Sequence, residues 1–287
     1  MKTGTLYVVG TPIGNLGDLS PRAAECLENA DFIAAEDTRV TLKLLNYLNI
    51  KKPMVSYHEH NRYDKAHEIA DRIAAGESCA LVTDAGMPAI SDPGRELVDE
   101  CHARGLRVAS VPGPSAVITA LALSGLDVGR FTFEGFLSVN KPKRREHLAE
   151  IVSEKKTMVF YEAPHKLAAT LRDLADTLGD RRCAVIKELT KIHETVDRTT
   201  LCAAAETYGA MEKIKGEFVI IVEALPEERR PDMTLPEVME EVFRIMHDDG
   251  LSINDASKKA AKISGLKKSD IYKAASVQMQ KENGVDV

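Results

Sequence analysis

Short apolar runs alternate with helical patterns along the first 124 residues of this 287-residue chain, and this alternation restricts the folds open to it. The runs typical of β-strands occupy residues 5–9, 32–35, 54–56, 79–83 and 108–111. Helical patterns lie between or after these runs, beginning at Ser20 and Pro21, at residues 40–47 and 65–75, from residue 92 to Gly105, and at residues 114–123. Strands that alternate with helices form βαβ units, so the sequence predicts an α/β fold with a parallel sheet.

The second half continues the alternation with longer polar interruptions. Strand patterns occupy residues 132–136, 157–161, 183–187 and 217–222, and helical patterns occupy residues 145–153, 165–178 and 203–211. A basic loop is expected at residues 139–145, and a polar stretch without regular structure is expected after residue 187. These patterns predict a second α/β layer with a mixed sheet.

Two polar segments divide the chain into three parts. Residues 125–130 and the acidic, proline-bearing residues 223–232 are typical of linkers. Apolar residues at helical spacing follow the second linker, with a break near Gly265. We expect an N-terminal α/β domain at residues 1–124, a second α/β domain at 125–224 and a small basic helical module, like a helix-turn-helix, at 232–287.

Composition excludes several classes of protein. No apolar run approaches the roughly 18 residues of a membrane span, and the first ten residues are too short for a signal peptide, so we expect a cytoplasmic chain without a membrane partner. Five cysteines, none at CxxC spacing, predict free thiols and no metal site. The net charge of −6 limits nucleic-acid contacts to local basic patches, at residues 139–145 and 251–281.

An unusual polar or glycine-rich segment follows each strand of the first half. These segments are residues 10–15 (GTPIGN), 36–39 (EDTR), 58–61 (HEHN), 84–94 (DAGMPAISDPG) and 112–116 (PGPSA). Ligands of open parallel sheets bind outside the carboxyl ends of the strands, so these segments predict a single site. Ordinary turns rich in Gly, Pro and Asp remain the alternative explanation.

The first segment does not match the common phosphate-binding loops. A P-loop requires GxxxxGK[ST], and residues 10–15 lack its lysine. The dinucleotide fingerprint requires a glycine at the position of Pro12. A turn rich in Gly and Pro instead exposes main-chain groups at close range, which suits an adenosine-type ligand.

Charged side chains in the next segments are candidates for chemistry. Glu36, Asp37 and Arg39 form a cluster at a helix start, where acidic residues also stabilise the helix dipole. His58 and His60 would share one face of a strand, but the sequence offers no third metal ligand, and a polar loop facing the substrate is favoured. Ser115 lacks the GxSxG context of a nucleophile, so we expect a helix N-terminus packed on a ligand there.

Nine motifs in order resemble those of the ribosomal small-subunit methyltransferase I family, within the tetrapyrrole-methylase superfamily. They are GTPIGNLGDLSPRA, AAEDTRVTLKLL, VSYHEHN, LVTDAGMPAISDPG, VPGPSA, FTFEGFL, FYEAPHKL, KELTKIHET and KGEFVIIVE. The resemblance implies two α/β domains with S-adenosylmethionine in the cleft between them, and a homodimer. It also implies methylation of the 2′-hydroxyl of a cytidine in the decoding region of 16S rRNA, with the 30S subunit as partner.

Residues of the family site carry over to matching positions of this chain. The expected cofactor contacts are Ile13, Gly86, Met87, Pro88, Ile90, Ser115 and Ala116, then Tyr161 or Glu162, Leu189, Gly216 and Glu217. Related methylases often have Asp where this chain has Met87, so a carboxylate role is lost there.

A ribose hydroxyl is a weak nucleophile, so its methylation requires help from a proton acceptor or from local charge. The candidates are Glu36, Asp37, His58 and Glu188, with Arg39, Lys187 and Lys191 expected to position phosphates. The two basic patches are expected to bind the RNA backbone, which makes binding sensitive to salt. Two alternatives remain open: a methylase of corrinoids or porphyrins, and an RNA-binding factor without enzyme activity.

Overall fold

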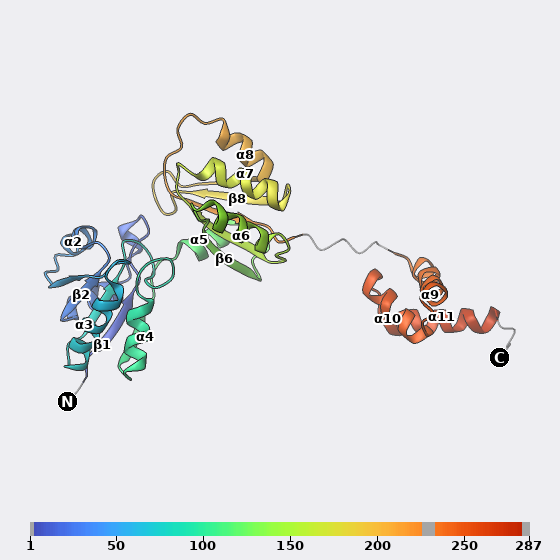
Figure 1. Ribbon diagram of the computed structural model, residues 1–287, viewed down its shortest axis with the longest axis horizontal. Helices are drawn as coiled ribbons and strands as arrows, with labels where there is room; N and C mark the ends of the chain where they lie inside the picture. The colour runs from blue at the N-terminus through green and yellow to red at the C-terminus, as the bar shows by residue number, and fades with distance from the viewer. Residues whose placement is uncertain (1–2, 226–232, 283–287) are drawn as a thin grey trace. The chain divides into compact units, whose positions relative to one another are not determined.

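The computed structural model describes residues 3–225 and 233–282. The chain forms two compact units, Met1–Leu225 and Pro226–Val287, and the first unit contains two β-sheets (Figure 1). None of the helices within the described residues is long and apolar enough to cross a membrane.

The first sheet has five strands, and all of its strand pairs are parallel. Its strands, in the spatial order β3-β2-β4-β1-β5, are β3 (Met54–Ser56), β2 (Phe32–Ala35), β4 (Cys79–Val82), β1 (Thr5–Val9) and β5 (Arg107–Val111). The predicted parallel sheet is therefore confirmed. Because every strand points the same way, all five carboxyl ends lie at one edge of the sheet.

Helices cover both faces of the first sheet. They are the short 3-10 helix η1 (Leu16–Asp18), α1 (Pro21–Asn29), α2 (Thr38–Tyr47), α3 (Arg62–Ala74) and α4 (Arg95–Ala103). Phe32 and Ala34 of β2 pack in the cluster with α3 and α4, whereas Ile33 and Ala35 pack in the cluster with α1 and α2. Alternate residues of a strand face opposite sides, so a fully apolar strand indicates a sheet buried on both faces (Figure 1).

The second sheet is mixed, as the sequence predicts. Its order is β6-β7-β10-β8-β9, with β6 (Phe131–Phe136), β7 (Thr157–Glu162), β10 (Phe218–Val222), β8 (Arg182–Lys187) and β9 (Thr195–Thr200). The β6–β7 pair is parallel, and the other three pairs are antiparallel.

Strand β9 lies in the expected polar stretch and is not predicted by the sequence pattern. Its sequence, TVDRTT, contains one aliphatic residue and has no apolar alternation. An edge strand pairs on one side only, and backbone hydrogen bonds to β8 hold β9 in place without a buried apolar face. A search for apolar periodicity therefore cannot find such a strand.

Three helices cover one face of the second sheet: α6 (Lys141–Ile151), α7 (Leu167–Leu178) and α8 (Leu201–Gly209). The expected basic loop at 139–145 is wrong, because α6 begins within it. The Asn140 side chain accepts a hydrogen bond from the Lys143 backbone N–H at 3.2 Å, and Pro142 stands at the start of the helix. Both features are typical of a helix N-terminus.

Helix α5 (Ala116–Ser124) covers the other face of the second sheet. Its residues Val117, Ala120 and Leu121 share a core cluster with Val159 and Ile221 of the second sheet. The chain thus changes from one sheet to the other before α5. The predicted domain boundary at residues 124–125 stays a prediction, and this packing favours a boundary near residues 112–115.

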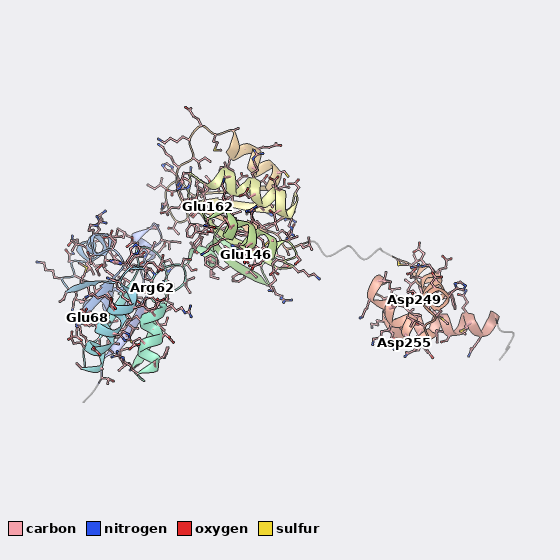
Figure 2. The ribbon with its side chains drawn as sticks, viewed as in Figure 1. Arg62, Glu68, Glu146, Glu162, Asp249 and Asp255 are labelled. Atoms are coloured by element: carbon pink, nitrogen blue, oxygen red, sulfur yellow. The ribbon has the colours of Figure 1, made fainter. Side chains whose placement is uncertain are left out.

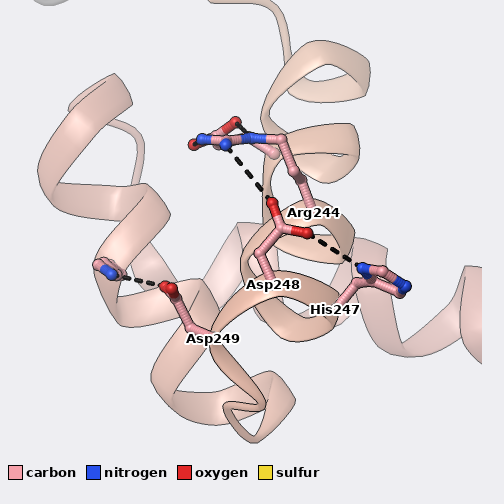
Figure 3. A network of polar contacts seen from close by, with 6 residues as sticks. Arg244, His247, Asp248 and Asp249 are labelled. Atoms are coloured by element: carbon pink, nitrogen blue, oxygen red, sulfur yellow. Dashed lines mark hydrogen bonds and ion pairs between the residues drawn. The ribbon is translucent and has the colours of Figure 1, made fainter.

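The second unit contains the three helices α9 (Leu235–Asp249), α10 (Ile253–Ser264) and α11 (Lys268–Glu282). Gly250 and Gly265 end α9 and α10 in the left-handed conformation, so the expected break near Gly265 is confirmed. The helices bury a core that includes Val238, Val242 and Ile271. Figure 3 shows surface ion pairs of this unit, including Lys259 with Asp249 at 2.7 Å.

Candidate functional site

The segments that follow the strands of the first sheet contact one another at its carboxyl edge. The Thr11 N–H donates to the Gly86 carbonyl at 2.9 Å, and the Gly86 N–H donates to the Thr11 carbonyl at 3.1 Å. Gly10 lies against Gly113 so closely that an added Cβ on Gly10 would be 2.6 Å from the Gly113 Cα. The first, fourth and fifth segments are therefore held together by their backbones.

Side chains bring the second and third segments to the same edge. The Asp84 Oδ1 accepts a hydrogen bond from the Asp37 N–H at 3.3 Å, and Glu36 Oε2 accepts one from the Asp84 N–H at 3.3 Å. Arg62, at the start of α3 (Figure 2), lies 2.5 Å from the Glu59 carboxylate of the third segment and 3.3 Å from the Glu96 carboxylate on α4. All five predicted segments thus gather at one edge of the sheet.

A cavity of about 390 Å³ lies between this edge and the second sheet. Its volume is within the range of small-molecule sites. The first and fourth segments and the start of α5 contribute Ile13, Ala85, Gly86, Met87, Ile90, Ser91, Asp92, Ser115, Ala116 and Val117. The second sheet contributes Phe136, Tyr161, Glu162, Ala163, Pro164, Leu189, Glu217, Phe218 and Val219.

The pairing of the second sheet explains how its residues reach the cavity. Phe218, at the beginning of β10, pairs with Glu162 at the end of β7 and with Lys187 at the end of β8. Phe136, at the end of β6, pairs with Tyr161. The carboxyl ends of β6, β7 and β8 and the amino end of β10 therefore form one edge, which faces the cavity.

Three carboxylates near the cavity have raised pKa values. Burial is the main cause for Glu36, Asp84 and Asp92. Negative neighbours add to it, because Asp84 raises the pKa of Asp92, and both Asp84 and Asp92 raise that of Glu36. Only Asp92 of these three lines the cavity. Asp92 was not among the predicted site residues, because an Asp before Pro is also the ordinary signal for a helix start.

The predicted catalytic residues of the second segment do not line the cavity. Asp37 caps α2 by accepting a hydrogen bond from the Arg39 N–H at 2.8 Å. Hydrogen bonds from Arg39 lower the pKa of Asp37 to about 2. The Arg39 side chain is exposed and lies 2.6 Å from the Asp37 carboxylate. This geometry favours a capping role for Asp37 over proton transfer.

The histidines of the third segment lie in the turn after β3, as expected for a segment that follows this strand, so the shared face that a strand would give them does not apply. Strand β3 ends at Ser56, and Asn61 accepts a hydrogen bond from the His58 N–H at 2.8 Å in the turn that follows. The rings of His58 and His60 still lie 5.9 Å apart, edge to face. Neither lines the cavity. Across residues 3–225 and 233–282, no group of three potential metal ligands occurs.

Glu188 has a conformation and partners typical of a structural residue. Its φ of 54° lies in the left-handed region, and its Oε1 accepts hydrogen bonds from Lys191 Nζ at 3.0 Å and the Glu217 N–H at 2.9 Å. These bonds lower the pKa of Glu188. An added Cβ at Gly216 would lie 2.9 Å from the Glu188 Cγ, so Gly216 makes room for this side chain. Glu188 thus holds the segment that presents Leu189 to the cavity.

Comparisons with known proteins identify the family. Residues 5–205 match the family model Tetrapyrrole (Corrin/Porphyrin) Methylases. The chain is 44% identical, over 94% of its length and 96% of the relative's, to ribosomal RNA small subunit methyltransferase I of Synechocystis sp.. It is 40% identical, over 97% of its length and 99% of the relative's, to the protein of that name from Haemophilus influenzae. The chain belongs to the ribosomal RNA small subunit methyltransferase I family.

Solved structures show the same fold at low sequence identity. Diphthine synthase aligns with a TM-score of 0.59 and 15% identity, over 77% of this chain and 90% of that one. Uroporphyrin-III-C-methyltransferase from Thermus thermophilus aligns with a TM-score of 0.56 and 18% identity, over 77% of this chain and 94% of that one. The predicted tetrapyrrole-methylase fold is therefore confirmed.

Most positions carried over from the methyltransferase I family lie in the cavity. Those in the lining are Ile13, Gly86, Met87, Ile90, Ser115, Ala116, Tyr161, Glu162, Leu189 and Glu217. Pro88 and Gly216 belong to the same segments but are not part of the lining. Glu162 (Figure 2) is buried, and its carboxylate accepts hydrogen bonds from the Ala163 N–H at 2.8 Å and from the Thr170 hydroxyl. It shapes the wall through these bonds.

Proposed function

We propose that this chain transfers a methyl group from S-adenosylmethionine to the 2′-hydroxyl of a cytidine in the decoding region of 16S rRNA. The observation that carries the proposal is the cavity between the carboxyl edge of the first sheet and the second sheet, in a chain of this family. The relatives are named ribosomal RNA small subunit methyltransferases. The choice of the ribose oxygen of a cytidine rests on the sequence resemblance.

The cavity fits an S-adenosylmethionine molecule in size and in chemistry. Apolar side chains such as Ile13, Leu189 and Val219 form walls for an adenosine. Gly86 has a φ of +83°, and an added Cβ would lie 3.3 Å from the Ile13 Cγ2, so a larger residue would crowd the space between them. The Ser115 hydroxyl lies at the start of α5 and makes no capping bond. When bound, the cofactor supplies an electrophilic methyl group.

The protein has to orient the ribose oxygen and accept the proton that the hydroxyl loses. Asp92 is suited to the second task, because its carboxylate lines the cavity and its raised pKa increases its affinity for a proton. The pKa of Glu36 is also raised, by burial and by Asp92 among its negative neighbours, but Glu36 does not line the cavity. The sequence-based candidates Asp37, His58 and Glu188 lie outside the lining. We therefore add Asp92 to the candidates and place it first.

The proposed RNA partner requires positive surfaces in a chain of net charge −6. The second unit carries Lys258, Lys262, Lys267 and other lysines on α10 and around the start of α11. The second unit has an apolar core of its own, so we expect the first unit to stay folded when the second is removed. Deletion of residues 232–287 is expected to weaken RNA binding and to leave cofactor binding intact. The 30S subunit, the homodimer and the cytoplasmic location belong to this proposal.

The decisive experiment supplies radiolabelled S-adenosylmethionine and the protein to 30S subunits from a strain without the corresponding gene. The expected result is label on one cytidine, in its ribose, mapped by nuclease digestion and mass spectrometry. Free 16S rRNA and a porphyrinoid mixture serve as parallel acceptors. Label on a porphyrinoid, or on no acceptor despite cofactor binding by calorimetry, would contradict the proposal.

A further inference from the structure

An exposed aromatic ring stands at the cavity. Phe136 ends β6, lines the cavity, and has 58% of its surface exposed. Tyr161 lies edge to face against it, with ring centroids 5.5 Å apart, and Phe133 contacts the same tyrosine at 5.0 Å. Such contacts fix the orientation of a ring without covering it. The packing therefore leaves much of Phe136 available to a flat partner.

Three unpaired cations follow this ring along the chain. Lys141, Lys143 and Arg145 are exposed in the first turns of α6. Within the part of the chain that the structure describes, none of the three has an ion-pair partner, whereas Arg144 lies 2.6 Å from the Asp173 carboxylate. The first turn of α6 contains no acidic residue.

The stability of α6 does not explain these cations. Positive charge near a helix N-terminus is unfavourable, because it lies at the positive end of the helix dipole. A sequence selected for helix stability would place Asp or Glu here. Residues that break a local rule in this way mark positions kept for another reason. A polyanion bound across Lys141, Lys143 and Arg145 would remove the unfavourable charge.

We infer that Phe136, Lys141, Lys143 and Arg145, together the β6–α6 surface, bind single-stranded RNA. A base stacks on Phe136, and the phosphates of neighbouring nucleotides contact the three cations. An aromatic platform beside a cationic track is the general arrangement for unpaired nucleic acid. The interior base pairs of a duplex cannot present a base face to Phe136, so the surface favours unpaired segments. The inference rests on the proposed function, because it supplies the route by which RNA reaches the cavity.

The test measures RNA binding by the full chain without cofactor, so it is independent of methyl transfer. The probe is a fluorescent single-stranded RNA of roughly ten nucleotides, titrated at several salt concentrations. Phe136→Ala is expected to weaken binding about tenfold without changing the salt slope. Phe136→Tyr retains an aromatic ring and is expected to restore most of the affinity.

Substitution of the cations, unlike substitution of Phe136, is expected to change the salt dependence of RNA binding. Lys141→Ser with Lys143→Ser is expected to lower the salt slope by roughly 0.7 for each charge removed, and to leave the cofactor affinity of the protein unchanged. The matched control is Lys51→Ser with Lys155→Ser. Both control lysines are exposed and precede the amino ends of strands β3 and β7, opposite the cavity edge. This control is expected to leave the salt slope within 0.2 of that of the unaltered chain, since weak phosphate contacts away from the cavity add little.

Three results would overturn the inference. The first is equal affinity of the Phe136→Ala variant and the unaltered chain. The second is equal binding of a blunt duplex of the same length. The third is a change of oligomeric state in sedimentation of Phe136→Ala with RNA affinity unchanged, which would make the surface a contact between copies of the chain. Failure of the proposed function is recognised separately, by the absence of label on 30S subunits with the unaltered chain.

Discussion

The two sheets of the first unit build opposite walls of one cavity in different ways. In the first sheet every strand is parallel, so all the cavity residues come from segments after strands or from the helix that follows. In the mixed second sheet they come from strand ends, from the beginning of β10 and the residue before it, and from the segments after β7 and β8. The first wall is joined by backbone contacts, whereas side-chain bonds such as those of Glu188 and Glu162 support the second.

This difference predicts where each wall tolerates change. A wall joined by backbones fails when any side chain is added between them, since backbone atoms cannot move aside cheaply. In a wall supported by side-chain hydrogen bonds, each bond removed displaces only the segment that it holds, so the effect on cofactor binding is expected to be smaller. Substitutions in each wall test this contrast, together with the role of the carboxylates whose pKa is raised, Glu36, Asp84 and Asp92, which all belong to segments of the first sheet.

The largest effect is expected from Asp92→Asn. The substitution keeps the shape of the side chain and removes the proton acceptor, so turnover is expected to fall at least a hundredfold. Cofactor affinity, measured by calorimetry, is expected to stay within about twofold, because the amide keeps the size of the carboxylate and one acceptor oxygen. Asp99→Asn, an exposed change on the same α4 region, is the control. Unchanged turnover of Asp92→Asn would contradict its role as proton acceptor. Glu36 would then be the next candidate, and Glu36→Gln would test it.

Gly10→Ala tests the backbone contact of the first wall. Its added Cβ would lie 2.6 Å from the Gly113 Cα and 2.7 Å from the Met87 sulfur. The segments have to separate, so we expect about tenfold weaker cofactor binding and a loss of about 1–3 kcal/mol in the free energy of unfolding. In Gly129→Ala the nearest atom lies 3.4 Å away, on a side chain, and little change is expected. Equal behaviour of the two variants in calorimetry and urea unfolding would refute the close contact.

Glu188→Gln tests the second wall. The amide keeps an oxygen for the Glu217 N–H but loses the charge that attracts Lys191. Because one bond of two survives, cofactor affinity is expected to fall only two- to fivefold, and the pH dependence of turnover is expected to stay the same. A shifted pH profile, or a loss of turnover as large as for Asp92→Asn, would instead support the sequence-based assignment of Glu188 as a proton acceptor.

Sequence patterns were sufficient for the first sheet and insufficient for the second. A parallel sheet brings all of its carboxyl ends together, so the position of the site follows once the strands are found. The edge strand β9 carries no apolar alternation and was missed. Tyr161 and Glu217 face the cavity because of antiparallel pairings, which no local pattern encodes. Those residues were predicted only through the family resemblance.

Helix beginnings were also predicted less well than strands. The helix expected from residue 40 begins at Thr38, because the side chain of Asp37 caps it. Asp92 was taken for a helix start, but α4 begins at Arg95 after Gly94. Side chains of these types serve both capping and chemistry, and the choice depends on neighbours that are distant in sequence, such as Asp84 for Asp92.

The acidic group of the first wall predicts a pH dependence. Burial and Asp84 raise the pKa of Asp92, with Glu36 and Tyr161 as further neighbours. The acidic limb of the turnover profile is therefore expected to have its midpoint above the ordinary carboxyl value. Asp84→Asn removes one negative charge and is expected to move that midpoint to lower pH. A midpoint unaffected by Asp84→Asn would show that a different group titrates.

The same shift has a consequence for stability. A carboxyl whose pKa is higher in the folded state favours folding when protonated, so its contribution worsens as the pH rises from the unfolded-state value through the folded-state value. At neutral pH the buried charge of Asp92 lowers the free energy of unfolding by its full amount. Asp92→Asn is therefore expected to raise the free energy of unfolding at pH 7, and the gain is expected to shrink in urea titrations at lower pH.

The smallest effect is expected from Arg39→Ala at the outer rim of the first wall. The Arg39 side chain is 87% exposed, and solvent screens its pair with Asp37. We expect no measurable change in melting temperature or cofactor affinity, because Asp37 still caps α2 through its hydrogen bond from the backbone of residue 39. If Arg39 positions a phosphate, the salt slope of RNA binding falls by roughly 0.7. An unchanged slope would exclude Arg39 from the phosphate contacts of the first wall, and the contrast in salt slope with Lys141→Ser and Lys143→Ser would favour the second sheet as the wall that recognises RNA.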